Sequence, residues 1–93
     1  MKAIWKDKVL AESADTIIIE GNHYFPPESL KTEFFRTSSK LTTCHWKGVA
    51  SYYDIVIDSE VNEDSAWYYP EPKEAAKEIG NYVSFWKGVK IAQ

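Results

Sequence analysis

Short runs of β-branched and aromatic residues recur along the chain, and polar or glycine-containing segments separate them. In the first third, residues 3–6 and 9–13 flank an Asp-Lys pair, and residues 16–20 (TIIIE) end at Gly21-Asn22. Runs of this length and composition are typical of short antiparallel strands joined by tight turns. We expect these three runs to form a meander. The isoleucine run is then either a strand buried on both faces or an exposed edge strand.

The segment 49–58 (VASYYDIVID) alternates regularly enough to predict one long strand. Successive side chains of a strand point to opposite faces of the sheet. One face then carries Val49, Ser51, Tyr53, Ile55 and Ile57, and we expect this face to be core. The other face carries the small Ala50 beside the large Tyr52. Small residues beside large rings leave space above a sheet, for either a ligand or the next layer of side chains.

The last third of the chain predicts one helix among further strands. Residues 59–65 (SEVNEDS) read as an acidic turn, and residues 66–69 as a brief aromatic strand that ends at a proline. Residues 72–79 begin with proline, place alanine and isoleucine along one face and precede a glycine, as a short helix does. We expect residues 82–86 and 89–92 to form the closing strands.

Composition and charge limit the classes of function. The chain has 93 residues, which predicts a single domain over residues 1–93. Its net charge of −3 provides no basic surface for a phosphate backbone, so we expect no nucleic-acid partner. No run of 18 apolar residues occurs, so we expect no membrane span. The one cysteine cannot form an internal disulfide, which is typical of a protein from the reducing cytoplasm.

The segment 42–53 (TTCHWKGVASYY) concentrates the chemically useful residues, among them the only cysteine. Together with the aromatic cluster at residues 66–69 and a tyrosine from the segment 23–27, it predicts an aromatic-lined pocket. Such a pocket is typical of a module that binds a small, partly flat molecule, with one lysine as the orienting charge. The expected site residues are Tyr24, Cys44, Lys47, Tyr52, Trp67 and Tyr69.

Alternative interpretations stay open for this segment. Cys44 could act as the nucleophile of a thiol-dependent enzyme, activated by Lys47 or by His45, although a lone cysteine is more often a small buried hydrophobe. In an extended segment His45 points to the face opposite Cys44. Lys47 could also be a solvated lysine or pair with the acidic residues 59–65. A third hypothesis is a structural or interaction domain whose exposed aromatic residues are covered by a partner, for example in a homodimer.

Four sequence blocks together resemble a known family. They are HYFPP (23–27), TTCHWKGVASYY (42–53), AWYYPEP (66–72) and VSFWKGV (83–89). Their order and spacing resemble the bacterial domain-of-unknown-function family 427 over nearly the whole chain. In the family pattern a proline usually follows the cysteine, whereas this chain has His45.

The resemblance implies a mainly-β fold and no established activity. The implied fold is a β-tent-like (Mss-four-like) small domain of two antiparallel sheets with one short helix. Relatives of the tent fold commonly bind zinc through two cysteine pairs, and the single cysteine excludes such a metal site here. The resemblance implies no cofactor.

A nucleotidyltransferase label is sometimes attached to this family, but the carboxylates of this chain do not fit that chemistry. It usually needs two or three carboxylates on adjacent strands that bind two metal ions. Asp54 and Asp58 lie four residues apart on one predicted strand, or roughly 13 Å. They are too far apart to bind one pair of metal ions.

Overall fold

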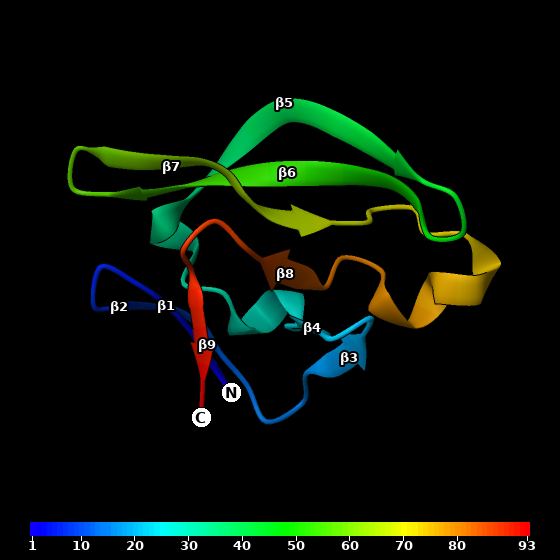
Figure 1. The fold of residues 1–93 in the computed structure, drawn as a ribbon, viewed down its shortest axis with the longest axis horizontal. Helices are drawn as coiled ribbons and strands as arrows, with labels where there is room; N and C mark the ends of the chain where they lie inside the picture. Colours follow the sequence, from blue (N-terminus) through cyan, green and yellow to red (C-terminus); the bar gives the residue numbers. More distant parts are fainter.

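The computed structural model describes residues 1–93 and has nine strands in three antiparallel sheets (Figure 1). The strands are β1 (Lys2–Trp5), β2 (Lys8–Glu12), β3 (Ile17–Ile19), β4 (Asn22–Tyr24), β5 (Phe35–Cys44), β6 (Gly48–Ile57), β7 (Glu60–Tyr68), β8 (Val83–Phe85) and β9 (Lys90–Ala92). The largest sheet, here called the main sheet, has the order β5-β6-β7-β8, and the other two are β2-β1-β9 and β3-β4. The predicted mainly-β fold is confirmed.

The first hairpin joins β1 and β2 through a turn at Lys6 and Asp7, both of which have positive φ. Strand β9 pairs with the other edge of β1, so the two termini lie close together (Figure 1). The expected three-stranded meander is wrong, because β3 pairs with β4 instead of β2. A tight turn at Glu20 and Gly21, again with positive φ, reverses the chain at once and makes this local pairing possible. Ile18 is exposed, so β3 is an edge strand and is not buried on both faces.

Two turns join β5, β6 and β7 of the main sheet, and the second, between β6 and β7, lies earlier in the chain than the sequence predicts. Asp58, with a φ of 54°, makes a tight turn between β6 and β7. The acidic turn expected over residues 59–65 is therefore wrong, because β7 already begins at Glu60. Glu60 and Glu63 are exposed in this part of β7, so their charged side chains can remain in water although the backbone is a strand.

The β3-β4 hairpin is attached to the main sheet through the residue after β4. The backbone N–H of Phe25 donates to the carbonyl of Val83 at 2.8 Å, and the N–H of Val83 donates back at 2.9 Å. This pair of hydrogen bonds places β4 beside β8, so the main sheet continues into the small one. Because neighbouring residues of an extended chain face opposite ways, Tyr24 and Phe25 pack on opposite faces.

Side chains pack against both faces of the main sheet. The cluster here called the inter-sheet core lies between the main sheet and β2-β1-β9 and contains Ala3, Leu10, Ala11, Phe25, Ile55, Ile57, Ala66, Val83 and Phe85. The cluster here called the aromatic core contains Tyr24, Ala50, Tyr52, Tyr69, Ala76 and Ile79. Strand β6 contributes to both clusters. The predicted core role of Ile55 and Ile57 is confirmed, but it is wrong for Val49, which is exposed at the start of the strand. The face of Ala50 and Tyr52 is also buried, beneath the next layer of side chains.

Helical structure is confined to three short 3₁₀-helices, at Pro27–Ser29, Thr32–Phe34 and Glu74–Ile79. The third lies where the sequence predicts a helix, but it starts at Glu74 and is kinked at Ala76. The backbone N–H of Lys73 donates to the carbonyl of Lys47 at 2.9 Å, so the residue before this helix is fixed to the β5–β6 turn. No helix here has the length and apolar character needed to cross a bilayer.

Candidate functional site

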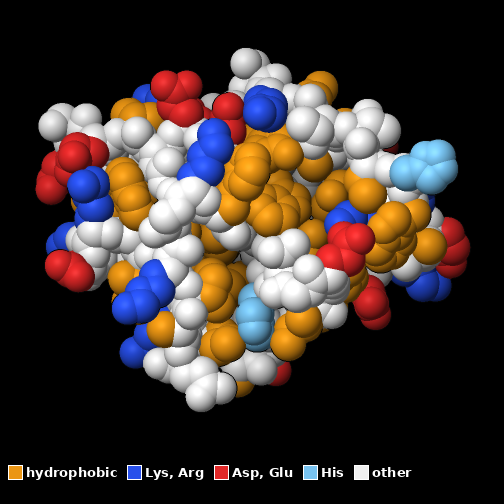
Figure 2. Space-filling model, viewed as in Figure 1, with side chains coloured by type: hydrophobic (Ala, Val, Ile, Leu, Met, Phe, Trp, Pro, Cys, Tyr) orange, Lys and Arg blue, Asp and Glu red, His pale blue; other side chains and the backbone are white.

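Four aromatic side chains and one lysine surround a hollow beside the main sheet. Tyr52 of β6 and Trp67 of β7 are direct cross-strand neighbours. Tyr69 follows β7 and Trp86 follows β8, and the fifth lining residue is Lys47 from the β5–β6 turn. This hollow, here called the aromatic pocket, has a volume of about 220 Å³ and opens to solvent. Figure 2 shows hydrophobic side chains exposed near the middle of the molecule, with basic side chains beside them.

Hydrogen bonds fix the orientation of the aromatic rings. The indole N–H of Trp67 donates to the hydroxyl of Tyr24 at 3.2 Å, and the two rings meet edge to face at 6.2 Å. Trp67 also meets Trp86 edge to face at 6.1 Å, and the indole N–H of Trp86 donates to a β7 carbonyl at 2.6 Å. The hydroxyl of Tyr52 shares a hydrogen bond with Thr42 at 2.9 Å. Rings held in this way form a preorganised pocket, which lowers the entropic cost of binding.

Lys47 is only 6% exposed, and its ammonium forms an ion pair with Glu20. The same ammonium lies 5.3 Å from the ring centre of Trp46 and 5.7 Å from that of Tyr69. Both alternatives considered for this lysine, a solvated side chain and a pair with residues 59–65, are therefore wrong. The partner comes from the β3–β4 turn, which the attachment of β4 to β8 brings near the aromatic core.

The ion pair keeps both of its members charged. Burial opposes the ammonium form of Lys47, but the hydrogen bond to Glu20 is the largest of the effects that outweigh it and raise the pKa of Lys47. The hydrogen bond from Lys47, and then its charge, lower the pKa of the Glu20 carboxyl. The pocket wall therefore carries a fixed positive charge with a negative charge beside it.

Burial raises the pKa of the Tyr69 hydroxyl to about 12, although the charge of Lys47 acts against this rise. Tyr69 is consequently neutral at physiological pH, so it adds no negative charge to the lining of the pocket. Glu20 is then the carboxylate that balances Lys47.

Cys44 ends β5 and packs against the aromatic core, but it does not line the aromatic pocket. Burial acts to raise the pKa of its thiol. The backbone N–H groups of Lys47 and Trp46, and then the charge of Lys47, outweigh burial, so the pKa of Cys44 lies below its ordinary value. His45 is exposed on the turn. A thiol role for Cys44 therefore stays a prediction.

The structure brings four of the six predicted site residues to one pocket and places Tyr24 directly behind Trp67. Sequence reasoning missed Trp86 and Glu20. Trp86 lies two residues after Ser84, which is the cross-strand neighbour of Trp67, so the two tryptophans share a face. That signal requires the β7–β8 register, which the sequence does not reveal.

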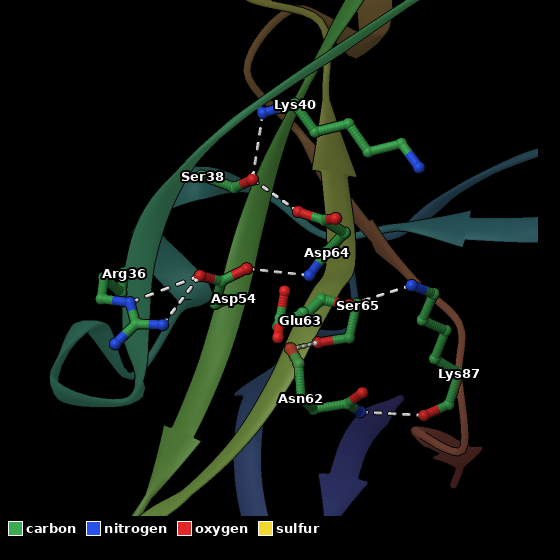
Figure 3. Close-up of polar contacts among 9 residues, drawn as sticks. All are labelled: Arg36, Ser38, Lys40, Asp54, Asn62, Glu63, Asp64, Ser65 and Lys87. Carbon is green, nitrogen blue, oxygen red and sulfur yellow. Dashed lines mark hydrogen bonds and ion pairs between the residues drawn. The ribbon is translucent and has the colours of Figure 1, made fainter.

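A second, polar hollow of about 670 Å³ lies near the middle of β5, β6 and β7, and its lining residues are Thr37, Ser38, Ser39, Lys40, Asp54, Glu63 and Asp64. The buried Asp54 accepts hydrogen bonds from Arg36 at 3.0 and 3.3 Å and from the backbone N–H of Asp64 at 2.9 Å (Figure 3). Ser38 donates to the carboxylate of Asp64, whose φ is positive. These groups hold an irregular stretch of the hairpin in place.

No group of three or more His, Cys, Asp or Glu side chains in the structure could hold a metal ion. Asp54 is satisfied by Arg36 and by backbone, and Asp58 lies in the β6–β7 turn. The four aromatic residues and the lysine that line the aromatic pocket can provide stacking, hydrogen bonding and charge complementarity.

Comparison with known proteins identifies a family and no activity. No curated protein matches the chain. One family model, described as a domain of unknown function (DUF427), matches residues 1–92. The chain therefore belongs to the DUF427 family.

Proposed function

We propose that the protein is a binding domain for a small planar molecule, which it holds in the aromatic pocket. One observation carries the proposal: Tyr52, Trp67, Tyr69 and Trp86 converge on a single open hollow, with the buried ammonium of Lys47 in its wall. Aromatic side chains with a few fixed polar groups are typical of small-molecule sites. With its single cysteine, the domain would work in the reducing cytoplasm.

The size and lining of the pocket favour a flat ligand. Its volume of about 220 Å³ is below the roughly 300 Å³ at which pockets for drug-sized molecules begin. One or two fused rings suit this space better than a bulky molecule. Planar rings also gain stacking or edge-to-face contacts with aromatic walls, worth about 0.5–1.5 kcal/mol for each pair.

Titration with a neutral bicyclic compound tests the proposal. We expect naphthalene-2-carboxamide to shift the indole N–H resonances of Trp67 and Trp86 saturably in ¹H–¹⁵N spectra. Trp5 packs against the inter-sheet core and serves as the internal reference. Uniform small shifts at all tryptophans, or no saturation, would contradict a site at this pocket.

A pair of tryptophan variants shows whether the wall itself binds. Trp86→Ala removes one wall of the pocket and should weaken binding of the amide. Trp5→Ala is the control, because Trp5 packs against the inter-sheet core and does not line the pocket. Equal loss of affinity in the two variants would mean that the compound binds elsewhere.

A further inference from the structure

Lysine ammonium groups lie over three of the four aromatic walls of the pocket. Each is 5.2–5.7 Å from the centre of its ring, and the pairs are Lys40 with Tyr52, Lys47 with Tyr69 and Lys87 with Trp86. Cations at this distance are attracted by the ring faces, which holds them near the pocket. Three ammonium groups therefore lie beside the pocket walls, although the whole chain is acidic.

These three lysines differ in how their charge is balanced. Lys47 is paired with Glu20, as described above. The ammonium of Lys87 donates to the backbone carbonyl of Glu63 at 3.1 Å, and no carboxylate lies within ion-pair distance of it. The ammonium of Lys40 has neither an ion pair nor a hydrogen bond, and its only close partner is the Tyr52 ring. Lys40 therefore has a cationic group free to bind an anion.

Lys40 also lines the polar hollow, but none of the carboxylates there (Asp54, Glu63 and Asp64) lies within ion-pair distance of its ammonium. Asp54 is paired with Arg36, and Asp64 accepts a hydrogen bond from Ser38. Figure 3 shows the backbone N–H of Lys40 bonded to Ser38, while its side chain extends away from Asp54. The Lys40 ammonium lies 5.5 Å from the ring centre of Tyr52, and Tyr52 is one of the residues that line the aromatic pocket.

We propose that the planar ligand is an aromatic anion, and that Lys40 binds its anionic group at the rim while its ring lies between the aromatic walls. This inference rests on the proposed function. It adds the charge class of the ligand and assigns the selection of that charge to Lys40. Lys47, already paired, holds the wall in place.

An isosteric pair of compounds tests the inference. Naphthalene-2-carboxylate and naphthalene-2-carboxamide share their shape and differ in charge, and both can be followed at the Trp67 and Trp86 indole resonances. We expect the carboxylate to bind more tightly and Lys40→Gln to lower its affinity roughly two- to fivefold, the range of an exposed charge interaction. The affinity of the amide should not change. Lys90→Gln, which replaces an exposed lysine of β9, is the matched control and should not alter the affinity for either compound.

Added salt provides a second readout, because charge interactions at an exposed rim are screened. Affinity for the carboxylate should fall between low and high ionic strength, and the fall should be steeper in the wild type than in Lys40→Gln. Equal affinities of the two compounds for the wild type would overturn the inference and leave the proposed function standing. A preference for the carboxylate that survives Lys40→Gln would overturn the role of Lys40. Failure of both compounds to bind would overturn the proposed function and the inference together.

Discussion

At the residue scale, the pocket depends on an ion pair whose two members are buried to different extents. Lys47 is 6% exposed, whereas the side chain of Glu20 is 56% exposed. A buried charge without a partner is strongly unfavourable, while a carboxylate at the surface can be solvated by water. The two halves of this pair are therefore not equivalent, and removal of either one should have a different consequence.

Glu20→Gln should destabilise the fold at pH 7 more than Lys47→Met does. The first variant leaves the buried ammonium without its carboxylate. The second removes the buried charge, keeps most of the apolar stem and should change the free energy of unfolding by less than about 1 kcal/mol. Thermal melts of both variants, with Glu12→Gln as a control at an exposed and unpaired glutamate, measure the difference.

The effect of Glu20→Gln should also depend on pH. The folded-state pKa of Glu20 lies below its ordinary 4.5, so its contribution is present above pH 4.5 and is lost as the pH falls through the lower folded value. The folded-state pKa of Lys47 is raised, so its contribution persists up to its ordinary 10.5 and is lost only at more alkaline pH. The difference in melting temperature between the wild type and Glu20→Gln should thus disappear at acidic pH. A gap that is constant down to pH 2 would show that Glu20 acts through something other than its charge.

The sequence predicts the aromatic residues that line the pocket better than it predicts the ion pair in the pocket wall. Tyr52, Trp67 and Tyr69 are recognisable because large rings recur in two clusters beside small residues. Glu20 is not recognisable, because it lies 27 residues from Lys47 and reaches it only when the β3–β4 hairpin attaches to β8. Ion-pair partners at such separation depend on tertiary structure, which local patterns do not contain.

At the element scale, the pairing of β6 with both of its neighbours, β5 and β7, is irregular near the middle of β6. The register with β5 shifts between Thr37 and Leu41, and the register with β7 shifts next to Asp54. The sequence predicts β6 well because its apolar residues alternate. It misses the start of β7 because EVNEDS has the composition of a turn, and the strand is completed by contacts from Asp54.

Asp54→Ala should therefore destabilise the hairpin. It removes the acceptor for the N–H of Asp64 and for Arg36, and a buried donor left without its partner costs roughly 1–3 kcal/mol. Urea denaturation measures the loss, and Asp15→Ala at an exposed loop position is the control. Equal stability of the two variants would show that Asp54 does not hold this stretch of the sheet.

At the scale of the whole molecule, the fold class is predictable but the connection of the sheets is not. Strand-forming runs and turn residues are local features, so the mainly-β architecture and the position of the short helix could be predicted. The pairing of β9 with β1 and of Phe25 with Val83 joins residues far apart in the chain. Nothing in their local sequence specifies these partners, which is why a three-stranded meander was expected at the N-terminus.

The two clusters on opposite faces of the main sheet should unfold together, because β6 contributes to both. Ile55 is fully buried in the inter-sheet core, so Ile55→Ala should lower the free energy of unfolding by about 2–5 kcal/mol. Near-UV circular dichroism reports on ring packing, including the aromatic core, and far-UV circular dichroism reports on the strands as a whole. The two signals should shift to lower denaturant by the same amount and remain coincident, as a two-state transition requires.

Val61→Ala, at an exposed position of β7, should change stability by no more than about 0.5 kcal/mol. A near-UV transition that stays at its wild-type midpoint while the far-UV signal moves would show that the aromatic core, and the pocket above it, folds independently of the inter-sheet core.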